Sequence, residues 1–144
     1  NLTCVTGGEP LLQDGSEELI RSLLKNGFTV LVETNGSVKI DSLPEDVITI
    51  MDIKCPDSGE SDKMELTNLQ HLKTDDEVKF IISSYSDYQW AKEFITNHEL
   101  TGKAKILFGA VSGLLDPGEL TKWMLDDNVN ARLQIQLHKF LGIN

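Results

Sequence analysis

Six β-rich runs, separated by segments of helical character, limit the possible folds of this chain more than any other feature. Several are almost continuously apolar, as strands covered on both faces are. Apolar strands that alternate with helices are typical of a parallel sheet covered by helices, so the sequence predicts an α/β fold. The runs are Leu2–Thr6, Phe28–Glu33, Val47–Ile53, Glu77–Ile82, Lys105–Val111 and Ala131–His138.

Helix signals and polar loops fill the intervals between these runs. Asp14 and Glu17 have capping-box spacing, while Asp116 and Pro117 supply an N-cap and an N1 proline. The polar stretch Cys55–Lys63 is expected to be a loop. No linker divides the chain, so residues 1–144 are expected to form a single domain. Helices are expected after Asp14, over Met64–Leu72, from Tyr88 to Ile95 and after Asp116.

Composition and charge exclude several classes of protein. The 144 residues carry a net charge of −10, and the 13 Lys and Arg residues are scattered, so no basic surface for nucleic acid is expected. No apolar run approaches the roughly 20 residues that span a bilayer. The two cysteines are too few for a disulfide framework or a metal cluster. A cytoplasmic protein is expected, with Cys4 in a buried strand and Cys55 more accessible.

Polar residues gather where the predicted strands end. In parallel sheets, ligands bind at the carboxyl ends of the strands. Gly7 and Gly8 would let a ligand approach the backbone, and Glu9 would suit an ammonium group, although a plain tight turn explains the pattern equally well. The other polar positions near strand ends are Glu33, Asn35, Asp52, Lys54, Lys79, Ser112, Gln134, Gln136 and His138.

The last predicted strand has a polar face of its own. Gln134, Gln136 and His138 alternate with Leu133 and Ile135. Alternating residues point to opposite faces of a strand. The polar set either lines the interior of a partly closed barrel or faces solvent on an edge strand, and the pattern leaves both interpretations open.

Five motifs in order make the chain resemble a known superfamily. They are "TGGEP", "ETNG", "DIKCPDSG", "DEVKFI" and "RLQIQLHK", spread over nearly the whole sequence. They resemble the radical S-adenosylmethionine enzymes and, within these, the 7-carboxy-7-deazaguanine synthases of queuosine biosynthesis. The resemblance implies a partial parallel (β/α)6 TIM-like barrel whose first β/α unit is missing, so that residues 1–144 are the C-terminal portion of the core domain.

The resemblance also implies chemistry. Such an enzyme is a carbon–nitrogen lyase that contracts the ring of 6-carboxy-5,6,7,8-tetrahydropterin to 7-carboxy-7-deazaguanine, with loss of ammonia. It uses a [4Fe–4S] cluster, S-adenosylmethionine and Mg²⁺, and takes electrons from a flavodoxin-like or other reductant. No nucleic-acid or membrane partner is implied, and the sequence leaves open whether the protein forms a homodimer.

Site residues follow from the same resemblance. Thr6, His138 and Asn144 are expected to contact the pterin. No metal ligand is expected in this chain, because the cluster cysteines and the magnesium-binding threonine would lie upstream of Asn1. Phe108 is followed by Gly109, where relatives tend to have Ser-Pro. The residues expected to bind the cofactor are Gly7, Gly8, Glu9, Glu33, Asn35, Asp52, Lys54 and Gln136.

Two other functions remain open at this stage. A glycyl-radical-enzyme activase shares the "GGEP" motif and the Asp-x-Lys pattern of Asp52 and Lys54. Such an activase needs a surface for a large protein partner, which the short chain and its terminal Gln-x-His do not favour. The other alternative is a non-catalytic barrel that binds a nucleoside or a pterin, supported by the absence of cluster cysteines.

Overall fold

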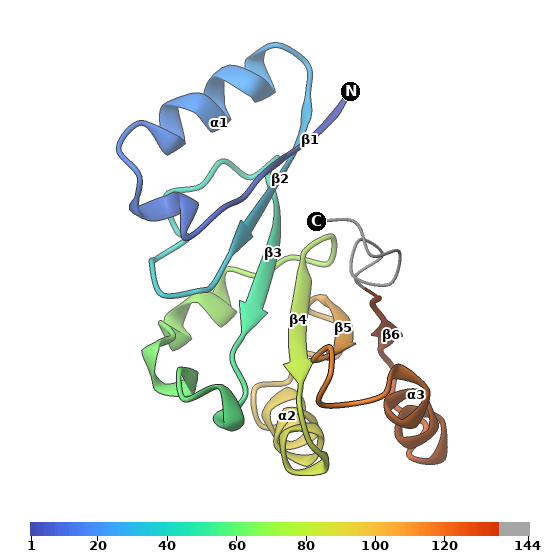
Figure 1. Cartoon of the computed structure of the whole chain (residues 1–144). Helices are drawn as coiled ribbons and strands as arrows, with labels where there is room; N and C mark the ends of the chain where they lie inside the picture. Colours follow the sequence, from blue (N-terminus) through green and yellow to red (C-terminus); the bar gives the residue numbers. More distant parts are fainter. Residues whose placement is uncertain (136–144) are drawn as a thin grey trace.

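The computed structural model, which describes residues 1–135, contains one curved sheet of six parallel strands. The strands follow one another in sequence order, each pairing with the next, as Figure 1 shows. The sheet therefore has two edges and forms an open barrel, which confirms the predicted fold class. The strands are β1 (Leu2–Val5), β2 (Thr29–Thr34), β3 (Ile48–Ile53), β4 (Glu77–Ile82), β5 (Lys105–Ala110) and β6 (Arg132–Leu133).

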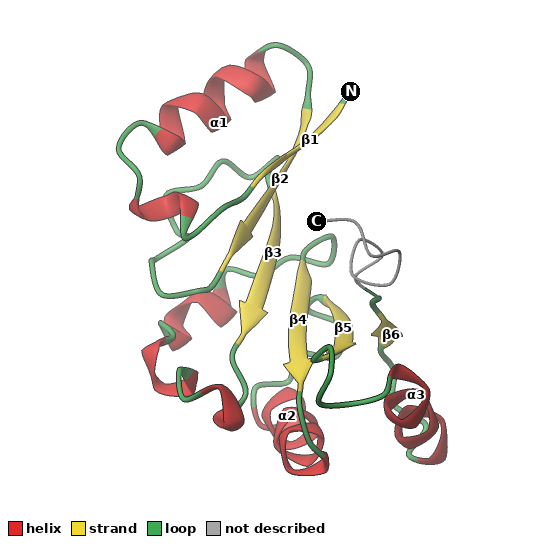
Figure 2. Cartoon of the chain, viewed as in Figure 1, coloured by secondary structure: helices red, strands yellow, loops and turns green. Residues whose placement is uncertain are grey.

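Three α-helices lie on the outer side of the curved sheet (Figure 2). They are α1 (Ser16–Lys25), α2 (Tyr85–Asn97) and α3 (Pro117–Asp126), and none of the helices within residues 1–135 could cross a membrane. The predicted start of α3 is confirmed, since Asp116 Oδ1 accepts hydrogen bonds from the N–H groups of Gly118 and Glu119. The predicted Asp14 cap is wrong, because the N-cap of α1 is Gly15. This glycine adopts a left-handed conformation and has no side chain that could cap the helix.

Four 3₁₀ helices complete the described chain. Leu66–Gln70 replaces the helix predicted over Met64–Leu72. Two further 3₁₀ helices, Pro56–Ser58 and Ser61–Lys63, lie within the stretch predicted as a loop. The fourth, Pro10–Leu12, begins at the proline of the "GGEP" motif.

The two faces of the sheet differ in chemistry. Residues that point outward pack against the helices in an apolar core, where the rings of Phe80, Phe108 and Tyr88 meet edge to face. Residues that alternate with them point into the concave side, and there β2, β3 and β4 contribute Glu33, Asp52 and Lys79. The alternation of the strands therefore puts the charged side chains on the inner face of the open barrel.

Both expectations about the cysteines are wrong. Cys4 is exposed because β1 is an edge strand and Cys4 lies on its concave face. Cys55 is 1% exposed because it continues the alternation of Met51 and Ile53, whose side chains pack under the helices. Burial raises the pKa of the Cys55 thiol, and the charge of Asp87 raises it further.

The last predicted strand is shorter than expected within the described residues. β6 covers only Arg132–Leu133, which pair with Leu107 and Phe108 of β5. Ile135, on the apolar face of the predicted strand, is 47% exposed. Gln136, His138 and Asn144 lie outside the described residues.

Candidate functional site

Two adjoining cavities lie at the carboxyl ends of the strands. The β1–β3 cavity has a volume of about 310 Å³, and the β3–β5 cavity about 400 Å³. Asp52 and Lys54 line both, so the two cavities adjoin at these residues. The β1–β3 cavity is lined by Thr6, Gly7, Gly8, Glu33, Thr34, Asn35, Asp52 and Lys54. The β3–β5 cavity is lined by Asp52, Ile53, Lys54, Cys55, Asp57, Ser58, Lys79, Ile81, Ser83, Asp87, Val111 and Leu114.

The structure thus brings together most of the residues predicted from the sequence. Seven of the eight predicted cofactor-binding residues lie within the described part of the chain, and all but Glu9 line the β1–β3 cavity. Thr6, predicted to face the substrate, lies in the same wall. Which ligand each residue contacts stays a prediction.

Gly7 and Gly8 form an uncovered turn at one side of the β1–β3 cavity. Their φ angles are +106° and +57°, in the region that disfavours residues with side chains. Apart from the adjacent residues, no atom of residues 1–135 lies within 4 Å of the position that a Cβ would take at either glycine. The turn therefore exposes bare backbone at the cavity, and the binding of a ligand there stays a prediction.

Glu9 directly follows this turn in the sequence. Its side chain is buried, at 6% exposure, and its carboxylate accepts three hydrogen bonds. The donors are the N–H of Leu11 at 3.1 Å, the hydroxyl of Thr34 at 2.8 Å and the N–H of Asn35 at 2.7 Å. Glu9 therefore joins the turn after β1 to the turn after β2, and its predicted contact with an ammonium group stays untested.

Two ion pairs lie among the residues that line the two cavities. Lys79 Nζ lies 2.9 Å from Glu33 Oε1, and Glu33 Oε2 accepts a hydrogen bond from the hydroxyl of Thr6 at 3.0 Å. The hydrogen bond that Lys79 Nζ donates to Glu33 Oε1 lowers the pKa of the Glu33 carboxyl, and the charge of Lys79 lowers it further. Glu33 thus connects β1 to β4 across the concave face.

The second pair leaves one acceptor without a partner. Lys54 Nζ lies 2.6 Å from Asp52 Oδ2, whereas Asp52 Oδ1 is buried and has no hydrogen-bond partner among residues 1–135. A buried acceptor without a partner costs about 1–3 kcal/mol. Because Asp52 lies where the two cavities meet, a ligand that donates a hydrogen bond there would remove this cost.

Lys79 is among the polar residues predicted near the strand ends, but it is absent from the residues expected to contact the cofactor or the pterin. Its side chain is 10% exposed, and it lines the β3–β5 cavity. The signal in the sequence was a lysine in the middle of the apolar run "EVKFII". A buried lysine is rare unless it has a partner, so such a position marks a functional or structural ion pair.

Asn68 holds the turn that follows β2, although it belongs to no motif. It is fully buried, its amide nitrogen donates to the carbonyls of Gly36 and Val38, and its amide oxygen accepts from the N–H of Ile40. Asn35, which lines the β1–β3 cavity, immediately precedes this segment. Asn68 therefore fixes one wall of the cavity from behind.

Replacing Asn68 with aspartate is expected to loosen this turn. Aspartate has the same shape but cannot donate to the two carbonyls, and each lost buried hydrogen bond costs about 1–3 kcal/mol. We expect a lower urea midpoint and weaker binding of S-adenosylmethionine. Asn97, the last residue of α2, provides the control: Asn97→Asp should leave binding unchanged and lower stability by no more than about 1 kcal/mol, the cost of a negative charge at a helix C-terminus. Unchanged stability of the Asn68 variant would contradict the assignment.

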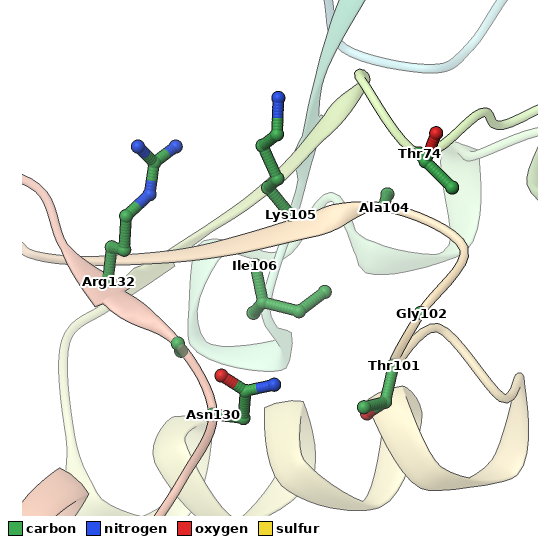
Figure 3. Close-up of a pocket in the computed structure, with 9 residues that line it drawn as sticks. Thr74, Thr101, Gly102, Ala104, Lys105, Ile106, Asn130 and Arg132 are labelled. Atoms are coloured by element: carbon green, nitrogen blue, oxygen red, sulfur yellow. The ribbon is translucent and has the colours of Figure 1, made fainter.

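A third cavity, of about 360 Å³, lies at the amino ends of β5 and β6, away from the strand carboxyl ends. In Figure 3, Lys105 and Arg132 extend to one side of the ribbon and Ile106 to the other. The two cations are already paired, Lys105 with Asp75 and Arg132 with Glu77. None of the predicted site residues lines this third cavity, so the strand carboxyl ends remain the candidate site.

The described residues do not fit an iron–sulfur cluster. Such clusters are held mainly by cysteine thiolates, and the sequence has two cysteines, one exposed on β1 and one buried after β3. Within residues 1–135, no group of three or more His, Cys, Asp or Glu side chains could hold a metal ion. This part of the chain supplies the walls of a site and no cluster ligands.

Comparisons with known proteins agree with this architecture. QueE from Escherichia coli has a similar crystal structure, with a TM-score of 0.73 and 21% identity over 94% of this chain and 56% of that one. The two chains therefore share a fold, an open α/β barrel of parallel strands. Two 7-carboxy-7-deazaguanine synthases are also similar in sequence. The one from Methanospirillum hungatei is 45% identical over 97% of this chain, and the one from Koribacter versatilis is 39% identical over 95%.

The chain belongs to the 7-carboxy-7-deazaguanine synthase family, as its motifs predict. It spans 58% of the length of the relative from Methanospirillum hungatei and 67% of that from Koribacter versatilis. No protein-family model matches the chain.

Proposed function

We propose that the protein of which this chain is part converts 6-carboxy-5,6,7,8-tetrahydropterin to 7-carboxy-7-deazaguanine with loss of ammonia. It would use S-adenosylmethionine, a [4Fe–4S] cluster, Mg²⁺ and a flavodoxin-like or other reductant. The observation that carries the proposal is the pair of adjoining cavities at the strand carboxyl ends, in a chain of this family. The cluster ligands would have to come from residues other than the 135 described.

The two cavities suit the two ends of S-adenosylmethionine. The β1–β3 cavity is polar, with the bare turn of Gly7 and Gly8 at its side, and fits the amino-acid end. The β3–β5 cavity has apolar walls at Ile81 and Leu114 with serines beside them, and fits the nucleoside end. Asp52 lines both cavities, and a ligand donor that reached its buried Oδ1, unpartnered among residues 1–135, would satisfy this atom.

Within this proposal the residues of the chain bind, orient and shield the reactants. The cofactor, when bound, supplies the radical chemistry that the protein side chains cannot perform. Lys54 and Lys79 offer positive charge to ligand carboxylates, and the carboxylates of Glu33 and Asp52 hold those lysines in place. Side chains that surround the bound reactants would also keep water away from a reactive intermediate.

The decisive experiment uses the full-length protein reconstituted with iron and sulfide in the absence of oxygen. Formation of 7-carboxy-7-deazaguanine from the carboxy-tetrahydropterin would support the proposal. Cluster formation with cofactor cleavage but no conversion of the pterin would favour a glycyl-radical-enzyme activase. Ligand binding without a cluster would favour a non-catalytic barrel.

A further inference from the structure

Asp87 is a buried carboxylate that lies outside every motif of the sequence. It belongs to the first turn of α2 and is 2% exposed. It accepts hydrogen bonds from the N–H of Ser83 at 3.1 Å, the hydroxyl of Ser83 at 2.7 Å and the N–H of Asp57 at 3.1 Å. Two of these donors belong to the turn after β4, and the third to the loop after β3.

The contact between these two loops is reciprocal. While Asp57 donates its N–H to Asp87, its own carboxylate accepts the hydroxyl of Ser84 and lies 3.2 Å from the hydroxyl oxygen of Ser83. Asp57, Ser83 and Asp87 all line the β3–β5 cavity. The two loops are therefore locked together at the rim of this cavity by side chains from both.

Capping of α2 explains only part of the bonding of Asp87: Ser84 and Asp87 have capping-box spacing, but the bond from the N–H of Asp57 comes from another loop. Ser84 is the N-cap and already accepts the N–H of Asp87. The bonds of the Asp87 carboxylate are made to groups outside the helix. A buried charge is expensive unless it is well bonded, and an apolar residue would pack as well, so its value lies in the geometry that it imposes.

We propose that Asp87 is a positioning residue that fixes the Cys55–Ser58 loop against the turn after β4 and thereby shapes the part of the site that takes a nucleoside. The identity of the ligand rests on the proposed function, whereas the locking of the loop does not. Cys55, 1% exposed at the start of this loop, reports whether the loop is closed. Removing Asp87 opens the loop, uncovers the Cys55 thiol and weakens nucleoside binding.

The test compares Asp87→Ala and Asp87→Asn with Asp127→Asn in the full-length protein. Asp127 accepts from Tyr88 and Lys92, and so joins the end of α3 to α2 without lining either cavity. The probe is 5′-methylthioadenosine, a nucleoside without an amino-acid end. Both Asp87 variants should bind it at least about tenfold more weakly than the wild type, and Asp127→Asn within about twofold.

A second measurement needs no ligand. The alkylation rate of Cys55, followed by peptide mass spectrometry, should rise by about tenfold or more in both Asp87 variants and stay unchanged in Asp127→Asn. Asp57→Asn keeps the N–H that Asp87 accepts and an acceptor for the serines, so it should leave Cys55 protected.

The results separate this inference from the proposed function. Faster alkylation together with no nucleoside binding, even by the wild type, would support the locking of the loop and count against the cofactor. Cys55 that stays protected in Asp87→Asn, or equal losses of binding in the Asp87 and Asp127 variants, would overturn the role of Asp87. If Asp87→Ala does not fold, Asp87→Asn and Ser83→Ala decide the matter in the same way.

Discussion

Replacing Glu9 with alanine is expected to destabilise the domain by on the order of 3 kcal/mol and to abolish binding of S-adenosylmethionine. The substitution leaves Leu11 N–H, Thr34 Oγ1 and Asn35 N–H without their acceptor. The turns after β1 and β2 would then separate, and both form walls of the β1–β3 cavity. Urea unfolding and equilibrium binding of the cofactor measure the two effects.

The ratio of these effects distinguishes two roles for Glu9. If it mainly joins the turns, Glu9→Ala lowers stability and cofactor affinity together. If it mainly binds the ammonium group, affinity falls while the urea midpoint stays in place. Glu18→Ala, an exposed acid in α1, is the matched control and should change neither. Loss of pterin binding with full retention of cofactor binding would contradict both roles.

Replacing Lys79 with methionine is expected to cost about 2 kcal/mol of stability. Removing one partner of a fully buried ion pair costs about 3–5 kcal/mol, and the partial exposure of Glu33, at 35%, reduces the penalty. Replacing Glu33 with glutamine in the same protein should restore much of the loss, because the uncompensated charge is then absent. Urea unfolding of both single variants and the double variant completes the cycle.

The pH dependence of stability provides an independent check on the same pair. The pKa of Glu33 is lowered in the folded state, so its ionisation stabilises the fold at pH values above the ordinary glutamate pKa of 4.5. This contribution is lost as the pH falls through the lowered pKa of Glu33. Lys79→Met should remove this acid-side loss, and an unchanged profile between about pH 3 and pH 7 would contradict the pairing.

Much of the fold could be predicted because its determinants are local. The ends of the first five strands agree with the predicted runs to within one residue. Asp116 caps α3, as its spacing indicates. Apolar periodicity, capping and left-handed glycines depend on neighbours a few residues away, and these the sequence displays directly. The same reasoning placed Asn35, Asp52 and Lys54 at one edge of the sheet, because parallel strands end together.

The sequence by itself determined the class of fold, the edge of the sheet that carries the site and the family of the chain. Only the tertiary structure decided which polar groups become partners. Glu9 meets Thr34 across 25 residues, Asn68 meets Gly36 across 32, and Asp87 meets Asp57 across 30. The place of β1 at the edge of the sheet and the packing of the helices over β3 also decided that Cys4 is exposed and Cys55 buried. Such contacts depend on how the sheet bends and how its loops pack, and no local pattern encodes them.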